Sequence, residues 1–166
     1  MKAYKGLPAA LRKSLTLVGC CLLFELAQDV RADEVEDTAL AFVQERHLGD
    51  SLGWLGYQVA SRTVTFASLV EAIGKTQAQD LVQKELQRLQ PAFQVQWDRN
   101  LAAAYAHAFT AQELQSLNEG RGSSSLMNKF RARNNEVGAE MKARSSELLK
   151  TFVAQALGNA QTSLAH

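Results

Sequence analysis

Beyond position 32, apolar residues recur every three or four positions, which is the spacing of one face of an α-helix. No run alternates apolar and polar residues for long enough to predict a β-strand. Capping and turn residues divide the pattern into helical ranges at 33–48, 52–73, 76–90, 92–108, 111–119 and 124–157. We therefore predict an all-α protein, a single-domain bundle of about five to six helices with a long C-terminal helix.

Three boundaries in this pattern carry specific expectations. The β-branched run Thr63-Val64-Thr65 predicts a kink or break within 52–73. Thr76 and Gln79 have the spacing of a capping box, which predicts a helix start. Pro91 predicts either the end of that helix or the first turn of the next one.

The strongest local signal is the start of the short fifth range. Thr110 and Glu113 have the spacing of a capping box, in which each side chain bonds the backbone N–H of the other. Phe109 and Leu114 flank them at the positions of a hydrophobic staple. We interpret these four residues as a structural capping device without catalytic content.

The last helix carries its apolar pairs in an eleven-residue repeat, at Leu126/Phe130, Val137/Met141 and Leu148/Phe152. Eleven residues over three turns keep the apolar stripe almost straight along a helix. This pattern suits a long helix that lies across a bundle. The alternative is a helix that associates with a second copy of itself, as in a homo-oligomer. Residues 158–166 are small and polar, and we predict a flexible C-terminal tail there.

Residues 1–32 are typical of a cleavable signal peptide. Basic residues precede an apolar run of ten residues at 15–24, which is too short to span a bilayer. Small residues before position 33 predict cleavage between Ala32 and Asp33, with the periplasm as destination. The alternative is a lipid anchor at Cys20, which follows Leu17-Val18-Gly19 as in a lipobox.

Composition and charge change after the predicted cleavage. The chain has 166 residues and a formal charge of +1, which argues against a nucleic-acid binder. Both cysteines lie in residues 1–32, so the predicted domain at 33–157 has no thiol chemistry. Residues 33–120 carry six basic and twelve acidic side chains, whereas 121–150 carry seven basic and three acidic. This asymmetry either neutralises the fold internally or defines a surface that faces a partner.

The search for catalytic and ligand-binding motifs predicts a non-enzymatic protein. The three histidines are isolated from one another, so we expect no metal site and no cofactor. Gly74-Lys75-Thr76 lacks the first glycine of a phosphate-binding loop. Glu136 and Glu140 share a helix face with basic residues, which predicts a solvated ion-pair ladder.

Two groups of residues are candidates for contact with a partner. Aromatic residues between glycines favour interfaces, although packing in the core is the alternative for them. Basic residues of the last helix and the turn before it could meet an acidic surface. The candidates are Trp54, Tyr57, Arg121, Lys129, Arg131 and Arg133.

Tyr105, Phe109-Thr110, Glu113-Leu114 and Leu117 resemble a motif of the DUF2059 family of exported bacterial proteins. That family shows a Tyr and then Phe-Ser/Thr-x-x-Glu-Leu. The resemblance covers residues 90–150, and it identifies the chain as similar to a divergent member. It implies an all-helical domain behind a signal peptide and supplies no catalytic residue.

These observations lead to three hypotheses about function. The first is an exported module that binds another protein of the cell envelope, such as an inhibitor or immunity protein against a toxic effector in the periplasm. The second is an envelope accessory or chaperone-like protein that uses apolar helical faces. The third is an enzyme of unrecognised type.

Overall fold

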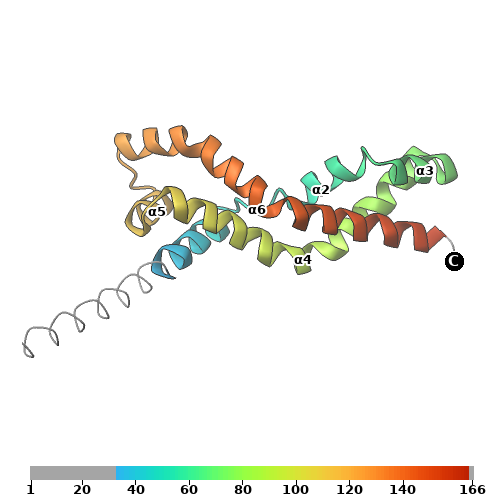
Figure 1. Cartoon of the computed structure of the whole chain (residues 1–166), viewed down its shortest axis with the longest axis horizontal. Coiled ribbons are helices and arrows are strands. Elements are labelled where there is room, and N and C mark those ends of the chain that lie inside the picture. Colours follow the sequence, from blue (N-terminus) through green and yellow to red (C-terminus); the bar gives the residue numbers. More distant parts are fainter. Residues whose placement is uncertain (1–32, 165–166) are drawn as a thin grey trace, which may run out of the picture.

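The structure is a computed structural model that describes residues 33–164, and within this range the chain is helical with no strand (Figure 1). After a first helical segment at 33–45 come α2 (Leu52–Ala60), α3 (Val64–Ile73), α4 (Lys75–Ala108), α5 (Ala111–Asn118) and α6 (Ser124–Leu164). The predicted all-α bundle with a long C-terminal helix is confirmed. The predicted signal peptide and Cys20 lie outside the described residues.

The long helices α4 and α6 run along each other in opposite directions and form the frame of the bundle (Figure 1). Helices α2 and α3 pack against both of them near the start of α4 and the end of α6. The first helical segment and α5 lie at the opposite end of the frame. The buried side chains of all six segments form one hydrophobic cluster.

The eleven-residue repeat faces this cluster. Val137, Met141 and Phe152 are buried, and the half-buried Phe130 and Leu148 pack against the cluster. The helix was predicted to end at 157, but it continues to Leu164. Its buried face also continues beyond residue 157, since Ala160 is fully buried.

Pro91 was predicted to end one helix or to lie in the first turn of the next, and both alternatives are wrong. Helix α4 is 34 residues long and contains Pro91 in its interior. A proline within a helix lacks one backbone donor and crowds the preceding turn. Here its ring lies on the exposed side, whereas Leu86 and Trp97 are buried on either side of it in the sequence. Packing of both halves against the same core outweighs the local cost.

The capping box expected at Thr76 and Gln79 is also absent. Helix α4 begins at Lys75, and no side chain caps its start. Gly74, at a φ of +83°, allows α3 to end and α4 to begin within one residue. Gln79 instead donates from Nε2 to the Tyr57 hydroxyl at 2.8 Å.

Two other boundaries follow the sequence more closely. The break predicted near Thr63 is confirmed, because the Thr63 hydroxyl accepts the N–H of Phe66 and caps α3. The first segment was expected to continue to residue 48, but it ends at 45. A turn follows, in which His47 has a φ of +54°. Arg46, in that turn, donates to the carbonyl oxygens at the end of α5.

Glycine allows α2 to approach its neighbours closely. A Cβ atom at Gly56 would lie 2.6 Å from Cε1 of Phe152 and 3.1 Å from Cδ2 of Leu86. Both neighbours are fully buried side chains with little room to move. Gly56 therefore fixes the distance of α2 from α4 and α6.

Candidate functional site

An apolar groove runs between α2 and α6, and α4 contributes to its lining. Its first part has a volume of about 530 Å³. Apolar side chains dominate this lining, and Trp97 and Leu101 are the contribution of α4. The full set is Leu48, Ser51, Leu55, Val59, Trp97, Leu101, Gly138, Met141, Lys142, Ser145, Ser146, Leu149 and Lys150.

A second hollow of about 380 Å³ continues the first, with which it shares Val59 and Lys150. It follows α6 toward its C-terminus and is lined by Val59, Thr63, Thr65, Lys150, Val153, Ala154, Leu157, Gly158 and Gln161. We call the two hollows together the α2–α6 groove. Along α6 its lining extends from Gly138 to Gln161.

Helical periodicity explains why α2 can serve both the core and the groove. Leu52, Gly56 and Ala60 are spaced by four residues and are buried. Leu55 and Val59 have the same spacing on the adjacent face, which lines the groove. Val59 is 36% exposed although it is β-branched and apolar. The sequence thus places apolar residues on more of the α2 surface than the core covers.

The charges in the α2–α6 groove have one sign. Within the two linings, the charged residues are Lys142 and Lys150, both on α6. Lys150 forms an exposed ion pair with Glu147 at 2.6 Å. Lys142 is exposed and forms no ion pair with another described residue. The groove therefore combines apolar walls with a basic edge.

Trp97 adds one unusual feature to the groove lining. Its side chain is 95% buried, and its indole N–H has no hydrogen-bond partner among the described residues. A buried donor that is left unpaired costs about 1–3 kcal/mol. The size of the ring, rather than a hydrogen bond, therefore accounts for its place beneath α6.

A larger hollow of about 590 Å³ lies toward α5, beside Phe42 and Phe130, and shares Leu48 with the first part of the groove. Arg46 is the charged residue in its lining. Its guanidinium donates to the carbonyl oxygens of Leu117 and Asn118 at 2.7 and 2.8 Å. This arginine is therefore already used to hold α5, and we do not assign a site to this hollow.

The structure separates the two aromatic candidates. Trp54 is 64% exposed on α2 and does not line the groove, so the alternative of core packing does not apply to it. Tyr57 is half-buried, with its ring edge-on to Phe66 at 6.2 Å between centroids. Its hydroxyl is bonded by Gln79. Trp54 thus remains available to a partner, whereas Tyr57 serves packing.

The four basic candidates lie in the N-terminal part of α6 and the turn before it, away from the α2–α6 groove. Three form ion pairs within the fold, and the fourth donates to an amide oxygen. The pairs are Arg121 with Glu119, Lys129 with Glu113, Arg133 with Glu136, and Arg131 with Asn128. Most of this charge is thus matched internally.

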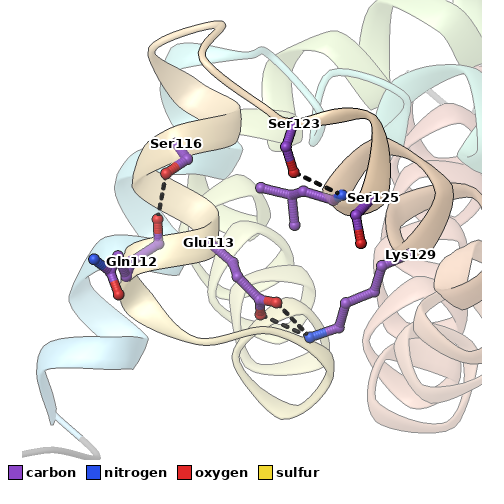
Figure 2. A pocket seen from close by; sticks show the side chains of 7 residues that line it. Gln112, Glu113, Ser116, Ser123, Ser125 and Lys129 are labelled. Carbon is purple, nitrogen blue, oxygen red and sulfur yellow. Dashed lines mark hydrogen bonds and ion pairs between the residues drawn. The ribbon is translucent and has the colours of Figure 1, made fainter.

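Figure 2 shows a small polar hollow of about 320 Å³ between α5 and α6. The predicted capping box is present there, since Thr110 and Glu113 exchange both expected bonds. Lys129 donates to both carboxylate oxygens of Glu113 at 2.7 and 2.8 Å and lies 5.1 Å from the centroid of the Phe109 ring. The two charges neutralise each other, so the hollow has a structural role.

The pKa of Glu113 reports the balance of forces in this hollow. Burial of the carboxyl raises the pKa, but the bonds from Lys129 and from the Thr110 N–H lower it, and the net direction is downward. A carboxylate with several donors remains ionised at lower pH. The same residue therefore caps α5 and holds α6 against it.

A second acidic residue connects α4 to α6. Glu140 accepts from Nδ1 of His107 at 2.8 Å and from Arg144 at 2.7 and 2.9 Å. Burial raises the pKa of Glu140, but the bonds from Arg144 and His107 lower it by more, so the net direction is downward. The ion-pair ladder predicted on α6 is confirmed at Glu136 and Glu140. His107 is exposed and adds a link between helices.

Residues 33–164 also provide no metal-binding cluster. They contain no group of three His, Cys, Asp or Glu side chains placed to hold a metal ion. Between residues 33 and 164, no helix has both the length and the apolar character required to cross a membrane.

Sequence reasoning identified no part of the groove lining. One signal was available in principle, because Lys142 and Lys150 interrupt an otherwise apolar face that includes Leu149, Val153 and Leu157. Which helix lies opposite this face depends on the packing of α2. The groove therefore becomes visible only in the folded structure.

Fold and site together define a small all-helical protein with an open apolar groove and a basic edge. No family model matches the chain, and neither a curated protein nor a solved structure matches it at a significant level. The resemblance to the DUF2059 family stays a prediction from the sequence.

Proposed function

We propose that this protein is a non-enzymatic binding module that is exported to the periplasm and recognises another protein of the cell envelope. In its most specific form, the proposal is an inhibitor or immunity protein that blocks a toxic effector in that compartment. The signal-like residues 1–32 support the location.

The observation that carries the proposal is the α2–α6 groove. Concave apolar surfaces with a few polar groups are the usual form of binding sites in proteins. Contiguous apolar surface that remains exposed on a small protein also marks sites of interaction. Val59 lies in the groove and Trp54 outside it, and both are exposed apolar residues of α2. These features favour binding over catalysis.

Co-expression of the full chain with the product of the neighbouring gene tests the proposal. We expect a stoichiometric complex on purification and rescue of cell growth from the toxicity of that product. Absence of both would contradict the inhibitor form. Val59→Asp should weaken the complex, and Val64→Asp is its control and should not. Both residues are exposed, but only Val59 lines the groove.

A chaperone-like accessory protein is the second candidate, and the apolar lining of the groove also supports it. The two candidates differ in selectivity. An inhibitor forms one tight complex, whereas a chaperone binds many unfolded clients weakly. Titration with a reduced, unfolded model protein and with the folded gene product distinguishes them: preference for the unfolded protein would favour the chaperone.

A further inference from the structure

We propose that the α2–α6 groove binds an amphipathic helix of the partner, with an apolar face and two acidic residues seven or eight positions apart. This inference rests on the proposed function, because it specifies which part of a partner protein the groove recognises. Three properties of the groove support it: its length, its apolar walls and the positions of its lysines.

The length of the groove suits a helix. Its lining extends along α6 from Gly138 to Gln161, which corresponds to about 35 Å at 1.5 Å per residue. A partner helix of about six turns would fill this length. Recognition of a helix in a groove uses apolar anchors spaced by three or four residues. Leu149, Val153 and Leu157 present apolar side chains at this spacing on one wall.

The opposite wall is suited to the same occupant. Leu55 and Val59 project from α2 one turn apart, and neither wall carries an acidic residue. An acidic helix would therefore meet no like charge in the lining itself, and the exposed Glu147 beside Lys150 is the acidic residue at its edge. Like charges across an interface would otherwise oppose its binding.

The lysines specify the charge and its spacing. Lys142 and Lys150 are eight residues apart on α6, so their positions are separated by about 12 Å along the helix axis. A helix that lies alongside α6 places residues seven or eight positions apart at the same separation. Because Lys142 has no ion-pair partner among the described residues, its ammonium group is available to such a carboxylate.

This arrangement favours a helix over an anionic amphiphile such as a fatty acid. A fatty acid carries one carboxylate at one end, whereas the groove presents two separated ammonium groups. Lys142 lies toward one end of the groove and Lys150 lies where its two hollows meet. An occupant that pairs both lysines needs charges along its length, and at Lys150 it replaces the exposed pair with Glu147.

The test uses two synthetic helices of about 24 residues, which match the length of the groove. Both carry a leucine face; one carries glutamates eight positions apart and the other carries lysines at the same positions. Fluorescence anisotropy measures their affinity for the purified full chain. We expect the glutamate peptide to bind at least about tenfold more tightly than the lysine peptide. Equal affinity, or no binding by either peptide, would overturn the inference.

Charge reversal on the protein provides the matched comparison. Lys142→Glu combined with Lys150→Glu should lower affinity for the glutamate peptide by about tenfold and reverse the preference between the peptides. Lys84→Glu is the control, because Lys84 is an exposed lysine of α4 outside the groove lining. Circular dichroism checks that the variants remain folded. An equal effect of Lys84→Glu would show non-specific charge attraction and would overturn the proposal.

Dodecanoate forms the third arm of the experiment. Displacement of the peptide by dodecanoate, with stronger binding of dodecanoate than of the glutamate peptide, would identify an amphiphile site and overturn the helix proposal. The proposed function has a separate outcome. If the full-length partner binds equally to the wild type and the double lysine variant, the protein is a binding module but the groove inference fails. If no partner binds, the proposed function itself fails.

Discussion

At the scale of single residues, Gly56 and Gly138 make opposite predictions for the same substitution. Gly56→Ala should lower the free energy of unfolding by about 1–3 kcal/mol, because the added Cβ meets Phe152 and Leu86. Gly138→Ala should raise it by about 0.5–1 kcal/mol, because nothing lies within 4 Å and alanine favours the helix. Urea denaturation measures both. Equal effects would contradict the close approach of α2.

Thr110 allows a second test at this scale. Thr110→Ala removes the acceptor for the Glu113 N–H at the start of α5 and should cost about 1 kcal/mol of stability. Thr151→Ala is the matched control, since this exposed threonine lies within α6 and bonds only the carbonyl of Glu147. If thermal unfolding shows the same loss for both variants, the capping box does not stabilise α5.

Residue-scale signals were also the ones that the sequence predicted best. Thr110, Glu113 and their bonds lie within four consecutive residues, so the spacing alone predicts the capping box. The partner of Lys129 could not be predicted in this way. Glu113 lies sixteen residues before it, and the two meet only because α5 folds back against α6.

At the scale of helices, tertiary packing overrides local rules. Pro91 carried the ordinary signal of a helix end, yet α4 passes through it, whereas the helix start predicted at Thr76 is found one residue earlier, at Lys75, without the capping box. The eleven-residue stripe of α6, in contrast, was predicted correctly. The pattern repeats over many turns, so a single residue that departs from it does not change which face of the helix is buried.

The uninterrupted course of α4 leads to a prediction about Pro91. Pro91→Ala should raise stability by about 1–3 kcal/mol, because alanine restores the missing backbone donor within a helix that is already formed. The neighbouring substitution Ala92→Pro places the same ring one residue along, and it should instead lower stability. Chemical denaturation of both variants checks this pair. Loss of stability in Pro91→Ala would show that the proline is needed for the course of α4.

Acidic pH should weaken the links between helices. Glu113 joins α5 to α6 and Glu140 joins α4 to α6, and both have pKa values below the ordinary 4.5. A carboxyl whose pKa is lowered by folding contributes stability that is complete above its unfolded pKa. This contribution is lost as pH falls through the folded pKa. We therefore expect the melting temperature to decrease below about pH 4.5.

The double variant Glu113→Gln/Glu140→Gln isolates this contribution. It should be less stable than the wild type at pH 7, and the difference should shrink as pH falls below 4.5, since the wild-type carboxyls then become protonated. Melting curves between pH 7 and pH 3 measure the difference. A constant difference over this range would show that these two carboxyls do not determine the acid sensitivity.

At the scale of the whole molecule, the distribution of charge acquires a more specific meaning in the folded chain. Seven of the thirteen basic residues after position 32 lie at 121–150, and the fold neutralises several of those in the first half of α6. Lys142 lies on the same helix between Glu140 and Arg144 and has no ion-pair partner among the described residues, whereas Lys150 forms an exposed pair with Glu147. Net charge by segment could not distinguish matched from available charge, because the ion pairs depend on which helices meet.

An acidic partner that docks at this basic edge should associate at a rate that depends on salt. Raising ionic strength from about 0.01 to 0.15 M shortens the screening length from about 30 to 8 Å, so long-range attraction weakens before contact. The association rate constant should decrease, while the dissociation rate constant, which depends on apolar contacts within the groove, should change little. Stopped-flow mixing with the glutamate peptide measures both rates. Because Lys142→Glu/Lys150→Glu removes the attractive charges, it should abolish or reverse this dependence, and an unchanged dependence would place the attraction elsewhere on the molecule.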